Sequence, residues 1–79
     1  MNGTTTRRMQ LRNLGRQVAH ARSAVAQQTI ERETAIRRDG GAHPRSIRAS
    51  RRLTRTRQAY RDLAALYRRR AREEAGHRQ

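Results

Sequence analysis

Arginine is the residue type of this chain whose number and spacing point to chemistry. All 20 basic residues are Arg, six residues are acidic, and the formal net charge of the 79-residue chain is +14. Eleven of the arginines lie between Arg45 and Arg72, where Asp62 is the single acidic residue. Guanidinium groups donate paired hydrogen bonds to phosphate and stay charged at physiological pH. A GC-rich genome would favour Arg over Lys but would not remove Asp and Glu. The excess of positive charge therefore predicts a polyanionic partner, with nucleic acid as the leading candidate.

The candidate binding residues have helical spacing. Arg48, Arg51 and Arg55 are three and four residues apart, so a helix would present them on one face at one-turn intervals, suited to a row of phosphates. A solvated helix face is the plainer interpretation, and the near absence of acidic neighbours makes it the weaker one. A basic N-terminal stretch would serve as an auxiliary arm. The candidate nucleic-acid-binding residues are Arg48, Arg51, Arg52, Arg55, Arg61, Arg68, Arg72, Arg8, Arg12 and Arg16.

Residues that would read bases are sparse. Asn13 and Gln58 are of types that bind adenine, but each is isolated, so a solvated position is the simpler interpretation. Tyr60 and Tyr67 are able to stack on bases, but their separation of seven residues favours packing within a helical seam. The sequence therefore predicts binding dominated by charge and shape, and it does not separate DNA from RNA.

No catalytic, metal or cofactor site is predicted. The three histidines, His20, His43 and His77, are scattered along the chain, and there is no Cys to complete a metal site. The sequence has no Gly-rich phosphate loop, and its arginine-rich segment offers no pair of carboxylates for acid–base chemistry. We therefore expect a non-enzymatic protein without a metal, a cofactor or a small-molecule substrate.

Two helices are predicted to position the arginines. Gly40 and Gly41 followed by Pro44 are typical of the end of one helix and the start of another. On both sides the chain is rich in Ala, Arg, Gln, Leu and Glu, which are good helix formers. Pro44 suits the first helical turn, and Ser46 is the competing N-cap. The expected layout of the single small domain, residues 1–79, is a helix at about 5–38, a turn at 39–44, a helix at about 45–75 and a short tail.

Apolar and small residues recur at alternating spacings of three and four, which predicts one contact face on each helix. The two seams are Leu11, Leu14, Val18, Ala21, Val25, Gln28, Arg32 and Ala35 in the first helix, and Ala49, Leu53, Thr56, Tyr60, Leu63, Leu66, Tyr67 and Ala71 in the second. A basic stripe that recurs every four residues from Arg8 to His20 is expected opposite the first seam. Folding at the turn would bring Val18 near Tyr67 in an all-α, antiparallel αα-hairpin.

The hairpin has few large apolar side chains, with no Phe, no Trp and two Tyr. Burying one such side chain stabilises by roughly 1.5–3 kcal/mol, whereas ordering each residue costs about 1.5 kcal/mol, so a lone monomer would be marginal. We therefore expect a homodimer, for example a four-helix bundle, or docking on a protein partner. No stretch approaches the ~18 apolar residues of a membrane span, and no secretory signal is evident. These absences predict a cytoplasmic protein without a membrane partner.

The layout resembles two kinds of small helical protein. One is the two-helix ribosomal protein of the large subunit, which has paired arginines early in its second helix, as Arg51 and Arg52 stand here. This chain differs from it in the spacing to the next arginine and lacks its acidic, Leu-rich first helix. The other is the Rop-type RNA-binding four-helix dimer, which is similar in topology only.

Two hypotheses about function remain from the residues. The leading one is a nucleic-acid-binding accessory protein, from a phage, a plasmid or a GC-rich bacterium. The alternative is a protein-interaction subunit or adaptor whose basic helices dock on an acidic partner in a larger complex.

Overall fold

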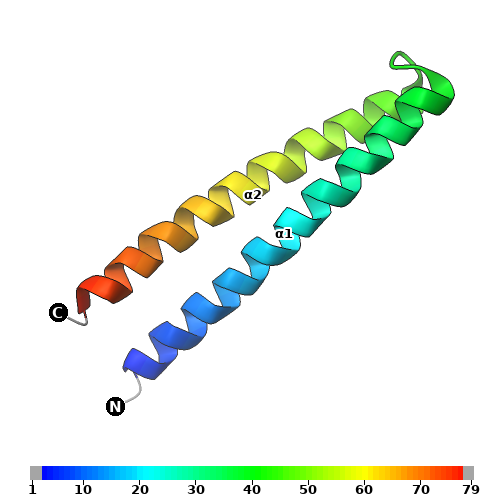
Figure 1. Cartoon of the computed structure of the whole chain (residues 1–79). Coiled ribbons are helices and arrows are strands. Elements are labelled where there is room, and N and C mark those ends of the chain that lie inside the picture. The colour runs from blue at the N-terminus through cyan, green and yellow to red at the C-terminus, as the bar shows by residue number, and fades with distance from the viewer. Residues whose placement is uncertain (1–2, 78–79) are drawn as a thin grey trace.

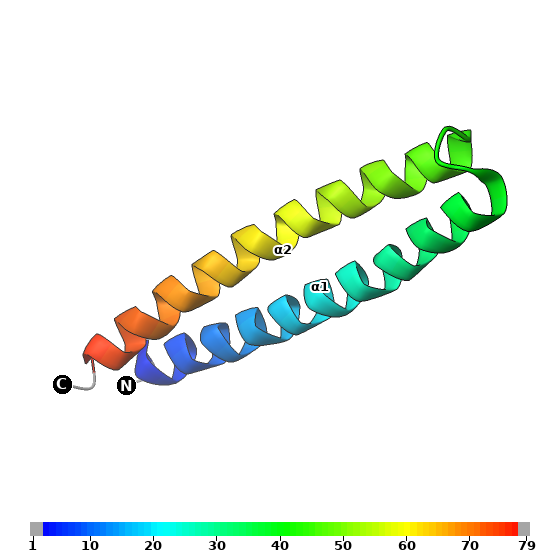
Figure 2. The same ribbon diagram turned by 45° about the horizontal axis from the view of Figure 1, so that its top comes forward.

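Two long antiparallel helices joined by a short turn form the hairpin. The computed structural model describes the backbone of residues 3–77 and the side chains of residues 5–76. Helix α1 spans Gly3–Asp39 and helix α2 spans Pro44–His77, so that the start of α1 and the end of α2 lie at the same end, here called the open end (Figures 1 and 2). The rod measures 57 × 15 × 13 Å. The predicted all-α hairpin is confirmed, and each helix extends one or two residues beyond its expected ends.

Gly40 ends α1 as the sequence predicts. Its φ of 85° lies in the left-handed region, and its backbone N–H donates to the carbonyl of Ile36 at 2.8 Å. Glycine adopts this conformation without the steric cost that a Cβ atom brings. One residue therefore both satisfies a carbonyl of the last helical turn and directs the chain away from the helix axis.

His43, and not Ser46, caps the start of α2. The backbone N–H of Arg45 donates to Nδ1 of His43 at 3.1 Å. Pro44 then takes the first helical position, where its missing N–H removes no intrahelical bond. Ser46 is fully buried, and its hydroxyl donates to the carbonyl of Gly40 at 2.7 Å. The competing assignment of the cap to Ser46 was wrong, because that hydroxyl points back across the turn and fastens the two helices together.

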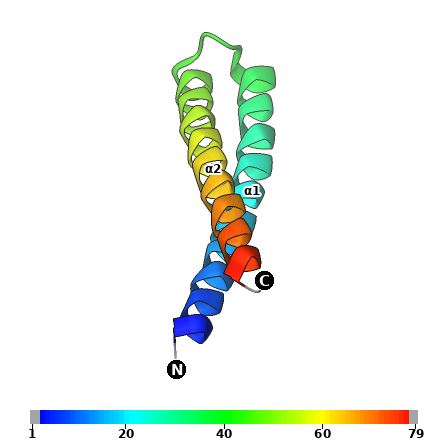
Figure 3. The same ribbon diagram turned by 90° about the vertical axis from the view of Figure 1, so that its left-hand side faces the viewer.

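The contact face follows a seven-residue repeat in both helices. One row of side chains is buried or half-buried throughout, at positions 11, 18, 25, 32 and 39 of α1 and 46, 53, 60, 67 and 74 of α2. A second row is half-buried at positions 14, 21, 28 and 35 of α1 and 49, 56 and 63 of α2. Such a repeat keeps the seams of two supercoiled helices face to face. The two helices accordingly cross along their length in Figure 3.

The seam is apolar only in part. Among residues 5–76, Leu53 is the one hydrophobic side chain that is buried, and the other buried residues are Ser46 and Glu74. Nearer the turn, Nε of Arg32 donates to the hydroxyl of Ser50 at 2.8 Å across the two helices. The hairpin therefore buries little apolar surface, as its composition predicts.

The two helices keep one register from the turn to the open end. Three cross-helix contacts join residues whose numbers add to 82, namely Arg32 with Ser50, Gly15 with Tyr67, and Arg8 with Glu74. A Cβ atom at Gly15 would lie 3.3 Å from Cε2 of Tyr67, so the ring lies directly over this glycine. The ring is thus one turn nearer the start of α1 than Val18, the neighbour predicted from the sequence, because the glycine leaves room for it.

Candidate nucleic-acid interface

The arginines of α2 point to solvent. All eleven arginines from Arg45 to Arg72 are exposed, whereas the seam positions of the same helix are occupied mainly by Ala, Leu, Ser, Thr and Tyr. Leu53 and Tyr60, which lie in this seam, are buried and half-buried. Because the seam takes one side of α2, the remaining sides are left to the guanidinium groups. The structure therefore arranges the densest run of positive charge in the sequence along one exposed helix.

Four of the candidate residues border one hollow on the surface of α2 near the turn. These four, named here the turn-end cluster, are Arg48, Arg51, Arg52 and Arg55. Within the described part of the chain, Arg52 alone among them has a carboxylate nearby, with its Nη1 3.9 Å from Oε2 of Glu31. That arginine side chain is still 65% exposed, so the pair is loose and weakly stabilising. The other three guanidinium groups have no ion-pair partner among the described residues and are available to an anion.

Three further candidates lie beyond the middle of α2. Arg61, Arg68 and Arg72 are exposed. Asp62, the acidic residue that interrupts the run, accepts a hydrogen bond from Nε2 of Gln58 at 2.9 Å. This bond gives the amide of Gln58 a partner within its own helix, which makes it a poor candidate for reading a base. The expectation that charge, and not base reading, dominates this surface is consistent with that arrangement.

The N-terminal candidates lie beside the contact face and not opposite it. Arg8, Arg12 and Arg16 line a groove whose other walls include Gly15 and Tyr67. Nε of Arg8 lies 3.9 Å from Oε1 of the buried Glu74 on the other helix. The expected position of this stripe on the far side of α1 was wrong, because the tyrosine ring crosses over the glycine and widens the contact face toward the stripe.

All candidate residues except Arg61, which lies near the middle of α2, fall into two groups at different ends of the rod. In the observed register, Arg68 and Arg72 lie across from residues 10–14 of α1, which places them at the open end with Arg12. The turn-end cluster lies across from the segment around Glu31, about 28 Å away along the axis at 1.5 Å per residue. The N-terminal arginines therefore add positive charge beside the C-terminal end of α2 and not beside the turn-end cluster.

Sequence reasoning missed three arginines beside the turn. Arg37 and Arg38 in the last turn of α1 and Arg45 in the first turn of α2 are exposed. Arg45 precedes Arg48 by three residues, so the helical spacing that identified the cluster was sufficient to include it. The arginines of α1 had no such signal, because only the fold brings the end of one helix beside the start of the other.

The two tyrosines and His43 have structural positions. Tyr67 packs over Gly15, and Tyr60 is half-buried in the same row. His43 accepts the hydrogen bond that caps α2. Among the residues that the structure describes, no group of three or more His, Asp and Glu side chains is placed to hold a metal ion.

Neither of the two described helices is long and apolar enough to cross a membrane. Comparisons of the chain with family models, with curated proteins and with solved structures gave no match, so the candidate interface stands on its own geometry.

Proposed function

We propose that this protein is a non-enzymatic nucleic-acid-binding protein that holds the phosphate backbone against the exposed side of α2. The observation that carries the proposal is the run of eleven exposed arginines from Arg45 to Arg72, which cover the sides of α2 outside the seam. At 1.5 Å per residue they extend over about 40 Å, or one guanidinium per about 3.7 Å of helix axis. A nucleic-acid strand carries one phosphate per about 3.4 Å. The charge density of the whole helix is thus close to that of one DNA strand, and the arginines on the side that faces the strand neutralise part of its charge.

The dimensions of the hairpin favour one mode of binding. The rod has a cross-section of 15 × 13 Å. The major groove of B-DNA is about 12 Å wide and admits a single helix, so the whole hairpin is too thick to enter it. The proposed mode therefore lays α2 along the backbone or at the mouth of a groove, while α1 stays outside. Binding of this kind depends on shape and charge and has little sequence preference.

Assembly and cellular setting belong to the same proposal. A second copy or a protein partner would cover the seam, in which Leu53 is the one buried hydrophobic side chain of residues 5–76. A cytoplasmic protein that accompanies the nucleic acid of a phage, a plasmid or a GC-rich bacterium is the setting that fits the charge and the abundance of Arg.

The proposal is tested by removing three charges from the turn-end cluster. Arg48, Arg51 and Arg55 are replaced together with Gln, and affinity for duplex DNA and for RNA is measured by fluorescence anisotropy over a salt series. Each lost phosphate contact flattens the slope of log K against log salt by about 0.9 on duplex DNA. We expect the slope to fall by roughly 2–3 and the affinity to fall on every sequence tested. Circular dichroism should show unchanged helicity, because all three side chains are exposed.

A control removes charge elsewhere. Arg22 of α1 is exposed and belongs to neither group of candidate arginines, and Arg22→Gln should change the slope by less than about 0.5. A loss of slope per charge removed that equals that of the triple variant would mean that binding follows total charge and not the side of α2. If the unmodified protein shows no salt-sensitive binding near ~50 mM salt, the nucleic-acid proposal is wrong. An acidic protein partner for the same arginines would then be the hypothesis to test.

A further inference from the structure

The hairpin exposes far more surface than a compact protein of its mass. Its solvent-accessible area is 6478 Å² for a mass of 9.2 kDa. Folded monomers of this mass expose about 4,900 Å², so the excess is about 1,600 Å². A protein–protein interface of standard size buries about 800 Å² on each partner. Each copy is therefore able to bury an interface of this size and still expose as much surface as a compact protein of the same mass.

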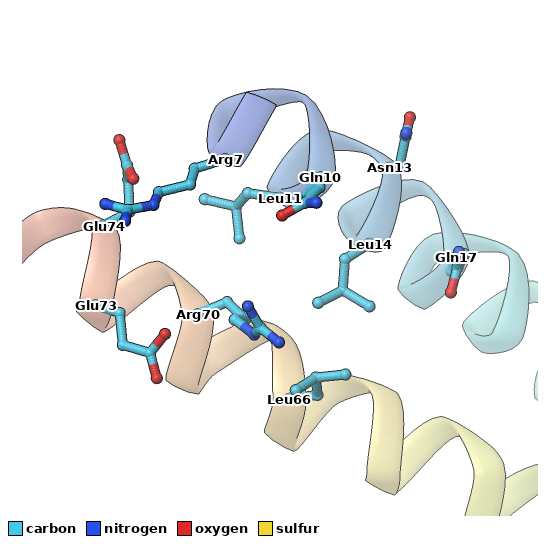
Figure 4. A pocket seen from close by; sticks show the side chains of 10 residues that line it. All are labelled: Arg7, Gln10, Leu11, Asn13, Leu14, Gln17, Leu66, Arg70, Glu73 and Glu74. Carbon is cyan, nitrogen blue, oxygen red and sulfur yellow. The ribbon is translucent and has the colours of Figure 1, made fainter. Parts of the chain in front are cut away.

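One groove combines apolar side chains with a balance of charge. It lies at the open end between α1 and α2, has a volume of about 640 Å³, and has Leu11, Leu14 and Leu66 in its lining. The last two side chains face each other across the space between the helices in Figure 4. All three leucines are only half-buried. The groove thus leaves part of the most apolar stretch of the seam in contact with water, which is unfavourable for a soluble monomer.

The charged side chains of this groove nearly balance one another. Arg7 and Arg70 line it together with Glu73 and Glu74 (Figure 4), and the carboxylate of Glu74 also lies 3.9 Å from Nε of Arg8. The chain as a whole has a net charge of +14. A phosphate backbone would be repelled by the exposed carboxylate of Glu73, and an acidic partner would meet little excess of positive charge here. A second copy of the same chain is the partner that meets the least repulsion at this place.

We propose that two copies of the chain associate through this groove with two-fold symmetry. In such an interface residue i of one copy contacts residue j of the other, and the reverse contact is made as well. A surface that carries both an exposed arginine and an exposed glutamate satisfies this requirement, because each of them finds the opposite charge on the partner. In the proposed arrangement Arg70 of each copy faces Glu73 of the other, and the leucines of the two grooves meet between them. The turn-end clusters of both copies stay uncovered, so the dimer has two surfaces for nucleic acid.

The salt dependence separates this association from nucleic-acid binding. Two chains of charge +14 repel each other, and added salt screens that repulsion. Dimerisation should therefore strengthen as salt is raised, whereas binding to nucleic acid weakens. The dimer surface belongs to the assembly part of the proposed function. It is tested independently of the nucleic-acid part, because the association is measured with no nucleic acid present.

The test is a charge exchange measured by sedimentation equilibrium on the full chain. Arg70→Glu and Glu73→Arg each place like charges opposite one another in the dimer, and each should raise its dissociation constant at least about tenfold. An equimolar mixture of the two variants should form a mixed dimer about as tight as that of the unmodified chain, because opposite charges then meet at both positions. Both side chains are exposed, so neither change should lower the helix content.

Matched controls reverse charge outside the groove. Arg69→Glu and Asp62→Arg change exposed positions of the same helix that do not line the groove, and each should change the dissociation constant less than about threefold. The proposal is overturned if the protein stays monomeric at every salt concentration when the protein concentration is raised to about 100 μM. A dimer on which the groove variants and the controls have equal effects overturns it as well. Failure of the mixture to restore the dimer also overturns it, because the proposed cross-copy pair then does not form.

Discussion

Two neighbouring glycines in the turn have different roles, and only one of them should be irreplaceable. Gly40 has a φ of 85°, whereas Gly41 has no positive φ and open space around its α-carbon. A Cβ atom in the left-handed region costs about 1–2 kcal/mol, so Gly40→Ala should lower the free energy of unfolding by that amount. Gly41→Ala should leave it unchanged or raise it by up to about 1 kcal/mol, because the unfolded chain loses freedom. Urea denaturation of the two variants at equal protein concentration measures the difference, and equal destabilisation would contradict this account of the turn.

Single residues also mark the limit of prediction from the sequence. A glycine followed by a proline near the middle of the chain was sufficient to place the turn. The role of Gly15 was not visible, because its significance depends on the ring of Tyr67, which lies far away in the sequence. In the sequence this glycine is a weak point of a helix. In the structure the ring of Tyr67 from α2 packs over it.

The helices differ from the sequence-based prediction mainly in how they are aligned. The alternating spacings of three and four identified both seams, because that pattern depends on local geometry alone. The register depends on which side chains fit each other, and a seam with Gln28, Arg32 and many Ala residues gives few size constraints. The hydrogen bond from Arg32 to Ser50 shows the result, since a polar pair is one of the contacts that align the helices near the turn.

The candidate interface was predictable to a similar degree. A helix with arginines on several sides and one seam leaves those arginines exposed, and α2 follows that rule. The basic stripe on α1 does not lie opposite the seam as predicted. The width of the contact face between two helices depends on the partner's side chains, and the seam pattern of one helix does not give that width. Arg12 and Arg16 lie beside this face for that reason.

The energy of the seam should be concentrated at Leu53. This side chain is 1% exposed, whereas Leu63 is half-buried in the same helix. Leu53→Ala should lower the free energy of unfolding by about 2–5 kcal/mol, which combines lost transfer energy and a cavity. Leu63→Ala should cost about 1–2 kcal/mol, since less of its surface is removed from water on folding. Urea unfolding followed by circular dichroism at one protein concentration gives both values. A larger loss at Leu63 would mean that a second copy of the chain covers that position.

The whole molecule has its charge spread along a thin rod, and this should make its stability depend on anions. A rod 57 Å long with a net charge of +14 repels itself until counterions or a partner neutralise it. Ligands that bind the folded state raise its stability by about 2.7 kcal/mol at 100 times Kd. Inorganic polyphosphate should therefore raise the Tm by roughly 10 °C over sodium chloride of equal ionic strength.

Thermal melts by circular dichroism measure that shift, and the Arg48, Arg51 and Arg55 triple Gln variant is its control. The variant should show a smaller gain than the unmodified chain, because it presents fewer guanidinium groups to the same ligand. An equal Tm in polyphosphate and in chloride would mean that the charge is merely screened and that no polyanion is bound.

The constant register also makes the length of the hairpin adjustable. Residues 19–25 and 57–63 lie across from each other, and each block is one full seven-residue period of the seam. Excising both blocks would remove one repeat from each helix and shorten the rod by about 10 Å at 1.5 Å per residue. The turn, the open end and the phase of the seam would all be preserved. The hairpin is in this sense a molecular ruler, and insertions or deletions of matched seven-residue blocks would move its two groups of arginines apart or together in fixed steps.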